Sequence, residues 1–219
     1  MNKLYCIDLS FRTGVAYFED DELISYGFHE GIRPKGSQDF KNLIEAIDDL
    51  ISTILTEILE IQPNEIVIEQ TNRGRNRYTQ KQLEWMHLTL LRKLYDLNFN
   101  VYYLDTSEWK SLLGIKIDKN IRKFNAKLRK EGGRGKIKAK HVSIHYVNEK
   151  YQLDLLTKND DEAEAILLGL AFIKVKNEIG LEKFYSERDL KMKTARKEGT
   201  QKTKRKRTAK EGVSGTCDC

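Results

Sequence analysis

Two carboxylates stand at the ends of short apolar segments. Asp8 follows the run Tyr5–Ile7, and Glu69 follows Ile66–Ile68. A carboxylate that a strand carries out of an apolar interior needs a metal ion, a cationic side chain or hydrogen bonds, because removing its charge from water is costly. Strand ends also carry solvated acids, so these two residues become informative only together with other acids.

Further acids open a predicted helix in the stretch Asn159–Ala165. Acids near a helix N-terminus are favoured by the helix dipole, so a well-capped helix is one explanation. Asp161 and Glu164 lie three residues apart, and Asp160 and Glu164 lie four apart. Either pair shares a helix face, so helical geometry leaves open whether Asp160 or Asp161 acts with Glu164.

Acids on two strands and one helix can together bind divalent cations. Mg²⁺ prefers oxygen ligands, and two ions about 3.5–4 Å apart need several carboxylates that converge from separate elements. Such a pair of ions can activate water, hold the scissile phosphate and stabilise the leaving 3′ oxygen. We therefore expect two Mg²⁺ ions, with Mn²⁺ as a substitute, at Asp8, Glu69, Glu164 and an acid near Asp161.

The elements that would position these acids follow from the hydrophobic pattern. Three short strands come first, and a helix, a strand, a helix and a strand follow. The predicted strands are Leu4–Leu9, Thr13–Phe18, Leu23–Phe28, Glu65–Glu69 and Val101–Leu104. The first predicted helix runs from the N-cap Ser37 towards Pro63. A polar loop, Thr71–Thr79, precedes the second predicted helix. The remaining predicted helices, in order, are Leu83–Leu94, Val142–Leu153 and Glu162–Val175. This order is typical of an α/β domain that begins with an antiparallel meander.

The charge is strongly segregated along the 219 residues, whose formal net charge is +6. Residues 114–141 carry 11 basic and 2 acidic side chains, and residues 190–219 carry 10 and 3, whereas the remainder is net acidic. We expect one nuclease domain over residues 1–188 with a basic insertion at about 114–141. A basic tail, residues 189–219, is expected to be disordered when free. Basic surfaces on an acidic domain favour a nucleic-acid partner.

An arginine-rich loop directly follows Glu69, over Asn72–Tyr78. Guanidinium groups spaced by Gly and Asn can reach phosphates on either side of a metal site. The side chains expected to contact DNA are Arg73, Arg75, Arg77 and Tyr78 in this loop, and Lys136 and Lys138 in the basic insertion.

Other classes of protein fit the sequence less well. No long uncharged apolar run predicts a membrane span, and no export signal precedes the first strand, so we expect a cytoplasmic protein without a small-molecule cofactor. Cys6 is expected to be a buried apolar residue, and Cys217 and Cys219 lack further ligands for a soft metal ion. His29, His87, His141 and His145 show no spacing typical of metal ligands.

The motifs Ile7–Ser10 with Thr13–Ala16, then Val67–Gln70, then Asp161–Ile166 resemble in order and spacing the RuvC-like Holliday-junction resolvases, especially their bacteriophage members. The likeness spans about residues 1–175. It implies an RNase H-like α/β fold with a five-stranded mixed sheet, three antiparallel strands and then parallel strands, flanked by helices. It also implies a homodimer that nicks two strands of a four-way DNA junction.

The resemblance assigns roles to particular residues. Asp8 and Glu69 match the family's first two catalytic acids, and Asp161 and Glu164 match its closing acidic motif, which favours Asp161 over Asp160. The stretches Trp109–Gly114 and Lys138–Lys140 resemble segments whose basic residues approach the phosphate. The resemblance therefore implies that Lys110 and Lys140 contact the phosphate near the metal ions.

The sequence also departs from the family pattern. Leu9–Ser10 stands where Pro-Gly is usual, and Glu164 stands where the final acid is usually Asp. Asn72 occupies the position of the aromatic wedge, so we expect Tyr78 to take over the unstacking of base pairs, if any residue does.

Three alternatives remain open at this stage. The fold implied by the resemblance also cuts flaps, RNA–DNA hybrids and single strands, so the substrate is not fixed. A non-catalytic nucleic-acid-binding protein is a second alternative. Asp8–Ser10 with Thr13–Gly14 also resembles the first phosphate loop of actin-like ATPases, but the residues after Val101 offer neither a second domain nor further glycine-rich loops.

Overall fold

The computed structural model describes residues 1–33, 40–70, 76–132 and 134–194. The chain divides into two compact units, residues 1–173 and a second unit that begins at Lys174. The elements of the first unit are β1 Lys3–Asp8, β2 Arg12–Glu19, β3 Glu22–Glu30, α1 Phe40–Ile61, β4 Glu65–Gln70, α2 Arg77–Asp96, β5 Val101–Asp105, α3 Thr106–Leu112, α4 Lys119–Lys130, α5 Ala139–Tyr151, the 3₁₀ turn η1 Thr157–Asn159 and α6 Asp160–Lys174.

The five strands form one mixed sheet in the order β3-β2-β1-β4-β5. β1 pairs antiparallel with β2, and β2 pairs antiparallel with β3, whereas β4 lies parallel to both β1 and β5. This confirms the predicted five-stranded mixed sheet. Ile7 is in register with Ile68 across the parallel pair, so the next residues, Asp8 and Glu69, lie side by side at the end of the sheet.

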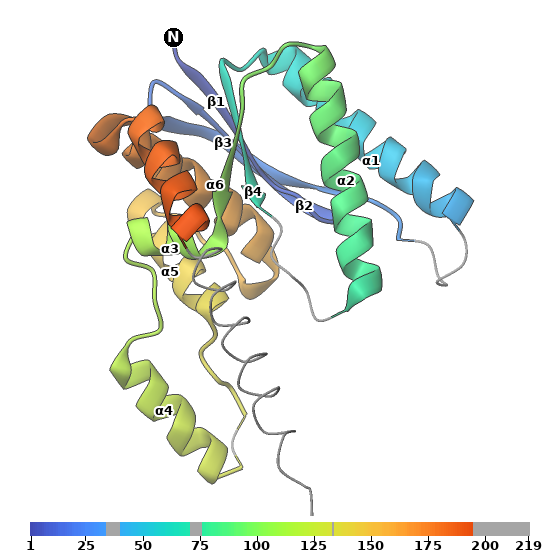
Figure 1. Cartoon of the computed structure of the whole chain (residues 1–219). Coiled ribbons are helices and arrows are strands. Elements are labelled where there is room, and N and C mark those ends of the chain that lie inside the picture. The colour runs from blue at the N-terminus through green and yellow to red at the C-terminus, as the bar shows by residue number, and fades with distance from the viewer. Residues whose placement is uncertain (34–39, 71–75, 133, 195–219) are drawn as a thin grey trace, which may run out of the picture. The chain divides into compact units, whose positions relative to one another are not determined.

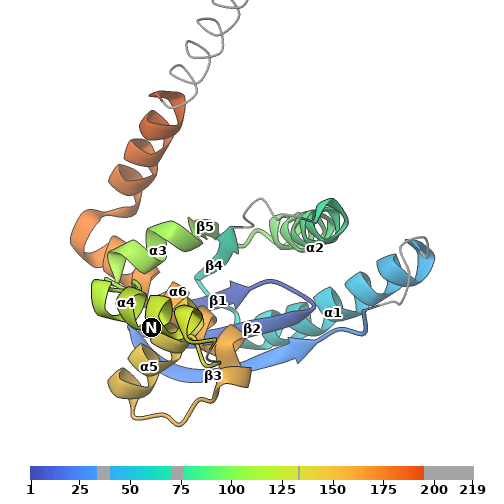
Figure 2. The same ribbon diagram turned by 90° about the horizontal axis from the view of Figure 1, so that it is seen from below.

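Helices cover both faces of the sheet, with α1 and α2 on one side and α5 and α6 on the other (Figures 1 and 2). Strand alternation divides the side chains between the faces. The α1/α2 face carries an apolar cluster that includes Ile7, Ile54, Ile68 and Leu90, all fully buried. The other face carries Cys6 and Phe18, which lie against α6 at Gly169.

Two glycines allow α6 to lie close to the sheet. A Cβ atom at Gly14 on β2 would lie 2.0 Å from the carbonyl oxygen of Asp161, and one at Gly169 would lie 2.3 Å from the ring of Phe18. These distances are far shorter than a van der Waals contact, so any side chain at either position would push the helix away. The first turn of α6 is therefore held against β2 by direct backbone contact.

Two features of the first unit differ from the predicted elements. α2 begins at Arg77, so Arg77 and Tyr78 lie in its first turn and not in a loop, because the Asn76 side chain accepts hydrogen bonds from the backbone N–H groups of Tyr78 and Thr79. The pattern also missed α3, which a capping box between Asp105 and Glu108 begins.

In the basic stretch 114–141, helix α4 has no buried residue, and α5 begins at Ala139. Ile115, at the start of the stretch, is buried. That the stretch is an insertion outside the core stays a prediction. The predicted N-cap Ser37 lies outside the described residues.

The second unit contains a π-helical turn, η2 Val175–Ile179, and a helix over residues 181–194. Residues 189–194 of the predicted tail are therefore helical, in contrast to the expectation of disorder, and residues 195–219, with Cys217 and Cys219, lie outside the described part of the chain. Within the described ranges, no helix combines the length and the apolar character that a membrane span requires.

Candidate metal centre

Three carboxylates from separate elements converge at the ends of β1 and β4. Asp8 ends β1, Glu69 lies one residue before the end of β4, and Glu164 lies in the second turn of α6. One oxygen of each carboxylate lies within 4.8 Å of the others, and all three residues are partly buried. The predicted acids Asp8, Glu69 and Glu164 are thus brought together, although they are up to 156 positions apart in the sequence.

The arrangement of the carboxylates follows from the fold. Asp8 and Glu69 stand on neighbouring parallel strands and point to the face that α6 covers, because they alternate with residues of the opposite apolar cluster. The backbone contact at Gly14 holds the start of α6 beside β1 and β2. Glu164, one turn further along α6, therefore faces the two strand acids.

The electrostatics of the cluster favour a bound cation. Burial raises the pKa of Asp8 well above its ordinary value, and the charges of Glu69, Glu164 and Asp161 raise it further. Burial also raises the pKa of Glu69. Like charges at short range oppose one another unless a cation neutralises them. Three converging carboxylates are a donor set that fits a hard divalent ion such as Mg²⁺ or Mn²⁺.

Hydrogen bonds from α3 orient Glu69. The Thr106 hydroxyl donates to Glu69 Oε1, and the indole N–H of Trp109 donates to Glu69 Oε2 at 3.0 Å. Trp109 is fully buried, so its ring is a fixed donor. Sequence reasoning did not identify Thr106, and it noted Trp109 only as part of a family-like stretch. The missed signal was the capping box, which begins α3 and sets its orientation.

Two lysines that the resemblance singled out lie at the site. Lys110 Nζ is 2.9 Å from Glu164 Oε1, and Lys140 Nζ is 3.0 Å from Asp160 Oδ2. Lys110 also lies over the Trp109 ring, 4.6 Å from its centre. Each lysine thus neutralises one acid of α6 in the absence of another cation.

Asp161 is oriented towards Arg12, a residue that sequence reasoning missed. Arg12 Nη1 lies 2.5 Å from Asp161 Oδ2, and Arg12 also bridges both oxygens of Glu162. Burial raises the pKa of Asp161, and its hydrogen bond with Arg12 opposes that effect. Asp161 lies near enough to raise the pKa of Asp8, but it is not among the three converging carboxylates. Its role as a ligand, in preference to Asp160, stays a prediction.

The predicted DNA-binding side chains are spread over two elements. Arg77 is exposed and Tyr78 is partly buried in the first turn of α2, while Lys136 and Lys138 are exposed in the segment before α5. Arg73, Arg75 and Asn72 lie outside the described residues. Nothing in the geometry contradicts a DNA contact at the four that are described.

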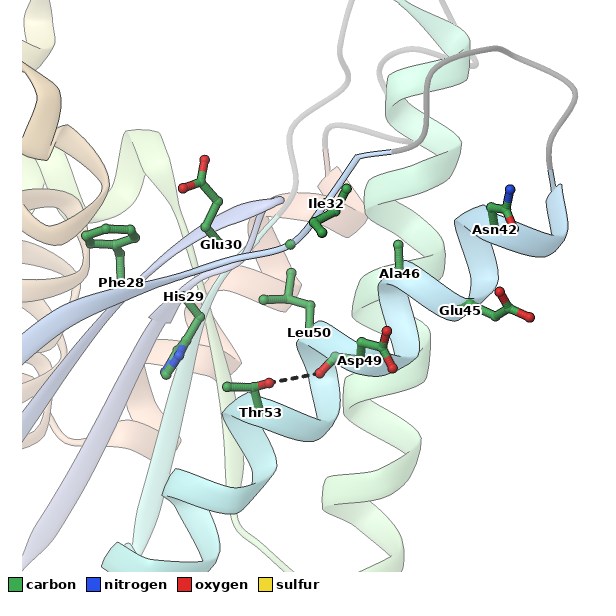
Figure 3. A pocket seen from close by; sticks show the side chains of 11 residues that line it. Phe28, His29, Glu30, Ile32, Asn42, Glu45, Ala46, Asp49, Leu50 and Thr53 are labelled. Carbon is green, nitrogen blue, oxygen red and sulfur yellow. Dashed lines mark hydrogen bonds between the residues drawn. The ribbon is translucent and has the colours of Figure 1, made fainter.

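A cavity of about 820 Å³ lies elsewhere, between β3 and α1 (Figure 3). Its lining includes Glu30, Glu45 and Asp49, but none of the three converging carboxylates. Glu30 and Glu45 point away from each other in Figure 3, so these acids do not form a ligand set. We place the chemistry at the carboxylate cluster, because there charged groups converge with orienting partners.

Comparisons by sequence give no relative: no family model matches the chain, and no curated protein matches it. Comparisons by structure find similar proteins. RuvC of T. thermophilus in complex with Holliday junction substrate gives a TM-score of 0.57 at 10% identity, and the match covers 82% of this chain and 98% of that one. A second Thermus thermophilus RuvC structure gives 0.54 at 13% identity, covering 79% and 94%. The chain therefore has the RNase H-like fold of the RuvC resolvases.

Proposed function

We propose that this protein is a divalent-metal-dependent endonuclease that nicks branched DNA, and that four-way Holliday junctions are its principal substrate. The observation that carries the proposal is the convergence of Asp8, Glu69 and Glu164 at the strand ends of this fold. The similar RuvC structure contains Holliday junction substrate, which supports branched DNA as the ligand class. Resolution of junctions would give the protein a role in DNA recombination and repair.

In this proposal the three carboxylates, together with Asp161, hold two Mg²⁺ ions, for which Mn²⁺ can substitute. Bound ions of this kind supply Lewis acidity to the scissile phosphate and lower the pKa of an attacking water molecule. The chain contributes the orientation of the ligands. Hydrogen bonds from Thr106 and Trp109 fix both oxygens of Glu69, so that its lone pairs are aimed before a substrate arrives.

Lys110 changes partner in this mechanism. In the structure it neutralises Glu164 through one contact of 2.9 Å. With Glu164 as a metal ligand, the Lys110 ammonium group would be free of this pair and would be close enough to the site to contact a phosphate oxygen. We propose a similar role for Lys140, which pairs with Asp160.

Contacts further from the site would supply affinity. Arg73, Arg75, Arg77 and Tyr78 on one side, and Lys136 and Lys138 on the other, are proposed to contact the arms of the junction. Phosphate contacts carry no sequence information, so these side chains would raise affinity without selecting bases. A homodimer, which would place two such sites on one junction, and a bacteriophage source remain predictions of the resemblance. A cytoplasmic location remains a prediction from the sequence.

A cleavage assay tests the proposal. Labelled four-way junction, flap, duplex and RNA–DNA hybrid are incubated with the full chain and Mg²⁺, Mn²⁺ or chelator. We expect Mg²⁺- and Mn²⁺-dependent nicks in the junction, none with chelator and none with Asp8→Asn. Asp48→Asn, a substitution of an exposed acid on α1, is the matched control and should cut normally. Equal cleavage by Asp8→Asn would refute the metal site, and preference for the hybrid would refute the substrate.

A further inference from the structure

Three basic side chains accompany the acids of α6, and they differ in how firmly they are held. Lys110 and Lys140 each make one ion-pair contact with a carboxylate. Arg12 makes three contacts, at 2.5 Å to Asp161 and at 3.1 and 3.0 Å to the two oxygens of Glu162. Its guanidinium also lies 4.1 Å from the centre of the Phe28 ring. Arg12 is therefore the cation that an incoming metal ion would displace least easily.

The partners of Arg12 also explain why it stays in place. Glu162 is only 2% exposed, so its charge needs a permanent counter-charge. A second donor, the Asn159 amide, reaches Glu162 Oε1 at 2.8 Å. Arg12 is thus fixed mainly by Glu162. The same guanidinium also binds Asp161, which lies near the converging carboxylates.

The three contacts of Arg12 have a consequence for metal loading. We infer that Arg12 holds Asp161 out of the metal-binding set of the free protein, so that a first divalent ion binds through Asp8, Glu69 and Glu164 and a second binds only after Arg12 releases Asp161. Arg12 is therefore a positioning residue. By holding Asp161, it determines the number of ions that the site binds. The inference rests on the proposed function, since it concerns the loading of the same site.

The first ion needs no such release. Displacing Lys110 from Glu164 breaks one contact, and Lys110 has side-chain mobility to move aside. Asp8 and Glu69 already place carboxylate oxygens within 4.8 Å of each other and of Glu164, so a first ion needs no rearrangement of these ligands. Releasing Asp161 also breaks one contact, but the two contacts with Glu162 keep Arg12 beside Asp161. Lys110 can move aside and Arg12 cannot, so the two loading steps differ in affinity.

The test must remove Arg12 without leaving Glu162 as a buried, unpaired charge. Arg12→Gln alone would leave the buried Glu162 without its cation, and this is expected to unfold the chain. The double variant Arg12→Gln/Glu162→Gln removes both charges, and the new glutamine at 162 can still accept the hydrogen bond from Asn159. Glu162→Gln alone is the matched control, because Arg12 then still pairs with Asp161.

Binding of Mn²⁺ alone is measured by the loss of the free-ion signal in electron paramagnetic resonance, with circular dichroism to verify folding. We expect the natural chain and Glu162→Gln to bind one Mn²⁺ tightly and a second weakly. The double variant should bind the second ion about tenfold more tightly, a factor typical of losing one charge-assisted hydrogen bond. Adding Asp161→Asn to the double variant should abolish this gain.

The outcomes separate the inference from the proposed function. If the natural chain binds no Mn²⁺, the metal site fails and the inference fails with it. If the natural chain binds Mn²⁺ but the double variant shows an unchanged second affinity, only the role of Arg12 is overturned. That role is likewise overturned if the variant with Asp161→Asn keeps the gain.

Discussion

The face of the sheet under α1 and α2 holds a continuous apolar cluster, whereas the face under α6 combines apolar side chains such as Phe18 and Phe172 with glycines and carboxylates. Ile54 and Leu90 represent the first face, where large side chains fill the space between helix and sheet. On the second face Gly14 and Gly169 bring the α6 backbone close, and Asp8 stands at the edge of the contact. The converging carboxylates are confined to the α6 face, so substitutions in the α1/α2 cluster and at the carboxylates should have separable effects.

The strongest test of this division is Asp8→Asn. We expect DNA cleavage to fall about 10³-fold or more, because a metal ligand is lost. The free energy of unfolding without divalent ions should rise by about 1 kcal/mol, because the substitution removes a charge that burial and neighbouring acids disfavour. Cleavage kinetics and urea unfolding measure the two effects. A loss of stability together with activity would contradict the separation.

A substitution on the α1/α2 face should lower stability and leave the affinity for metal ions unchanged. Ile54→Ala removes a fully buried side chain of α1 and should lower the free energy of unfolding by about 2–5 kcal/mol. The affinity of the folded protein for Mn²⁺ should stay within about twofold. Ile44→Ala, at a 53% exposed position of the same helix, is the control and should change stability by less than about 0.5 kcal/mol. A parallel tenfold loss of Mn²⁺ affinity in Ile54→Ala would show that the faces are coupled.

The two faces should also respond to acid with opposite signs. Burial lowers the pKa of His87, on α2, to about 4, so the unfolded chain takes up the proton first and stability is lost as the pH falls from 6.5 towards 4. This loss amounts to about 3 kcal/mol at pH 4. The pKa of Asp8 is raised in the folded chain, so its contribution is present at low pH and is lost as the pH rises through that value.

Urea unfolding between pH 4 and 7.5, without divalent ions, separates these contributions. His87→Gln should flatten the loss of stability below pH 6.5, and Asp8→Asn should remove the opposing gain and so steepen it. If His87→Gln leaves the pH profile unchanged, burial of the imidazole is not the cause of the acid sensitivity.

The smallest effect is expected in the basic insertion, outside both faces. Lys138→Gln should weaken junction binding about threefold and reduce the slope of log affinity against log salt by about 1, because one phosphate contact is lost. Fluorescence anisotropy at several salt concentrations measures both quantities. Lys41→Gln removes an exposed charge on α1 and should change neither. Equal effects of the two substitutions would indicate net charge alone and not a contact.

Most of the fold could be predicted because each main element has a periodic apolar pattern and clear ends. The predicted strands and the helices α1 and α6 match the observed elements to within a few residues, apart from the start of α1 near Ser37, which is not described. α3 was missed because seven residues are too short for a helical period, although its capping box was visible. The start of α2 was misplaced because the arginines after Glu69 suggested a loop, while Asn76 caps a helix there.

The position of a site residue could be predicted only where the order of strands and helices determines it. The strand order brings Asp8 and Glu69 together, and an acid at the start of a packed helix was the natural third partner. The pairing of Arg12 with Asp161 had no signal, since 149 positions separate the two residues and no spacing rule connects them. The hydrogen bonds to Glu69 were likewise hidden, because they depend on the angle at which α3 leaves β5.

The contact between Gly14 and the Asp161 carbonyl has a consequence for the choice of ion. Because main-chain atoms on β2 and α6 already touch there, the walls that carry Asp8 and Glu164 cannot move closer, and the packed Gly169 further along α6 opposes their separation. Ca²⁺ needs ligand distances of about 2.3–2.6 Å and Mg²⁺ about 2.0–2.1 Å. A site whose width is nearly fixed would respond to ionic radius, so the backbone packing, and not only the type of ligand, would affect which divalent ion binds.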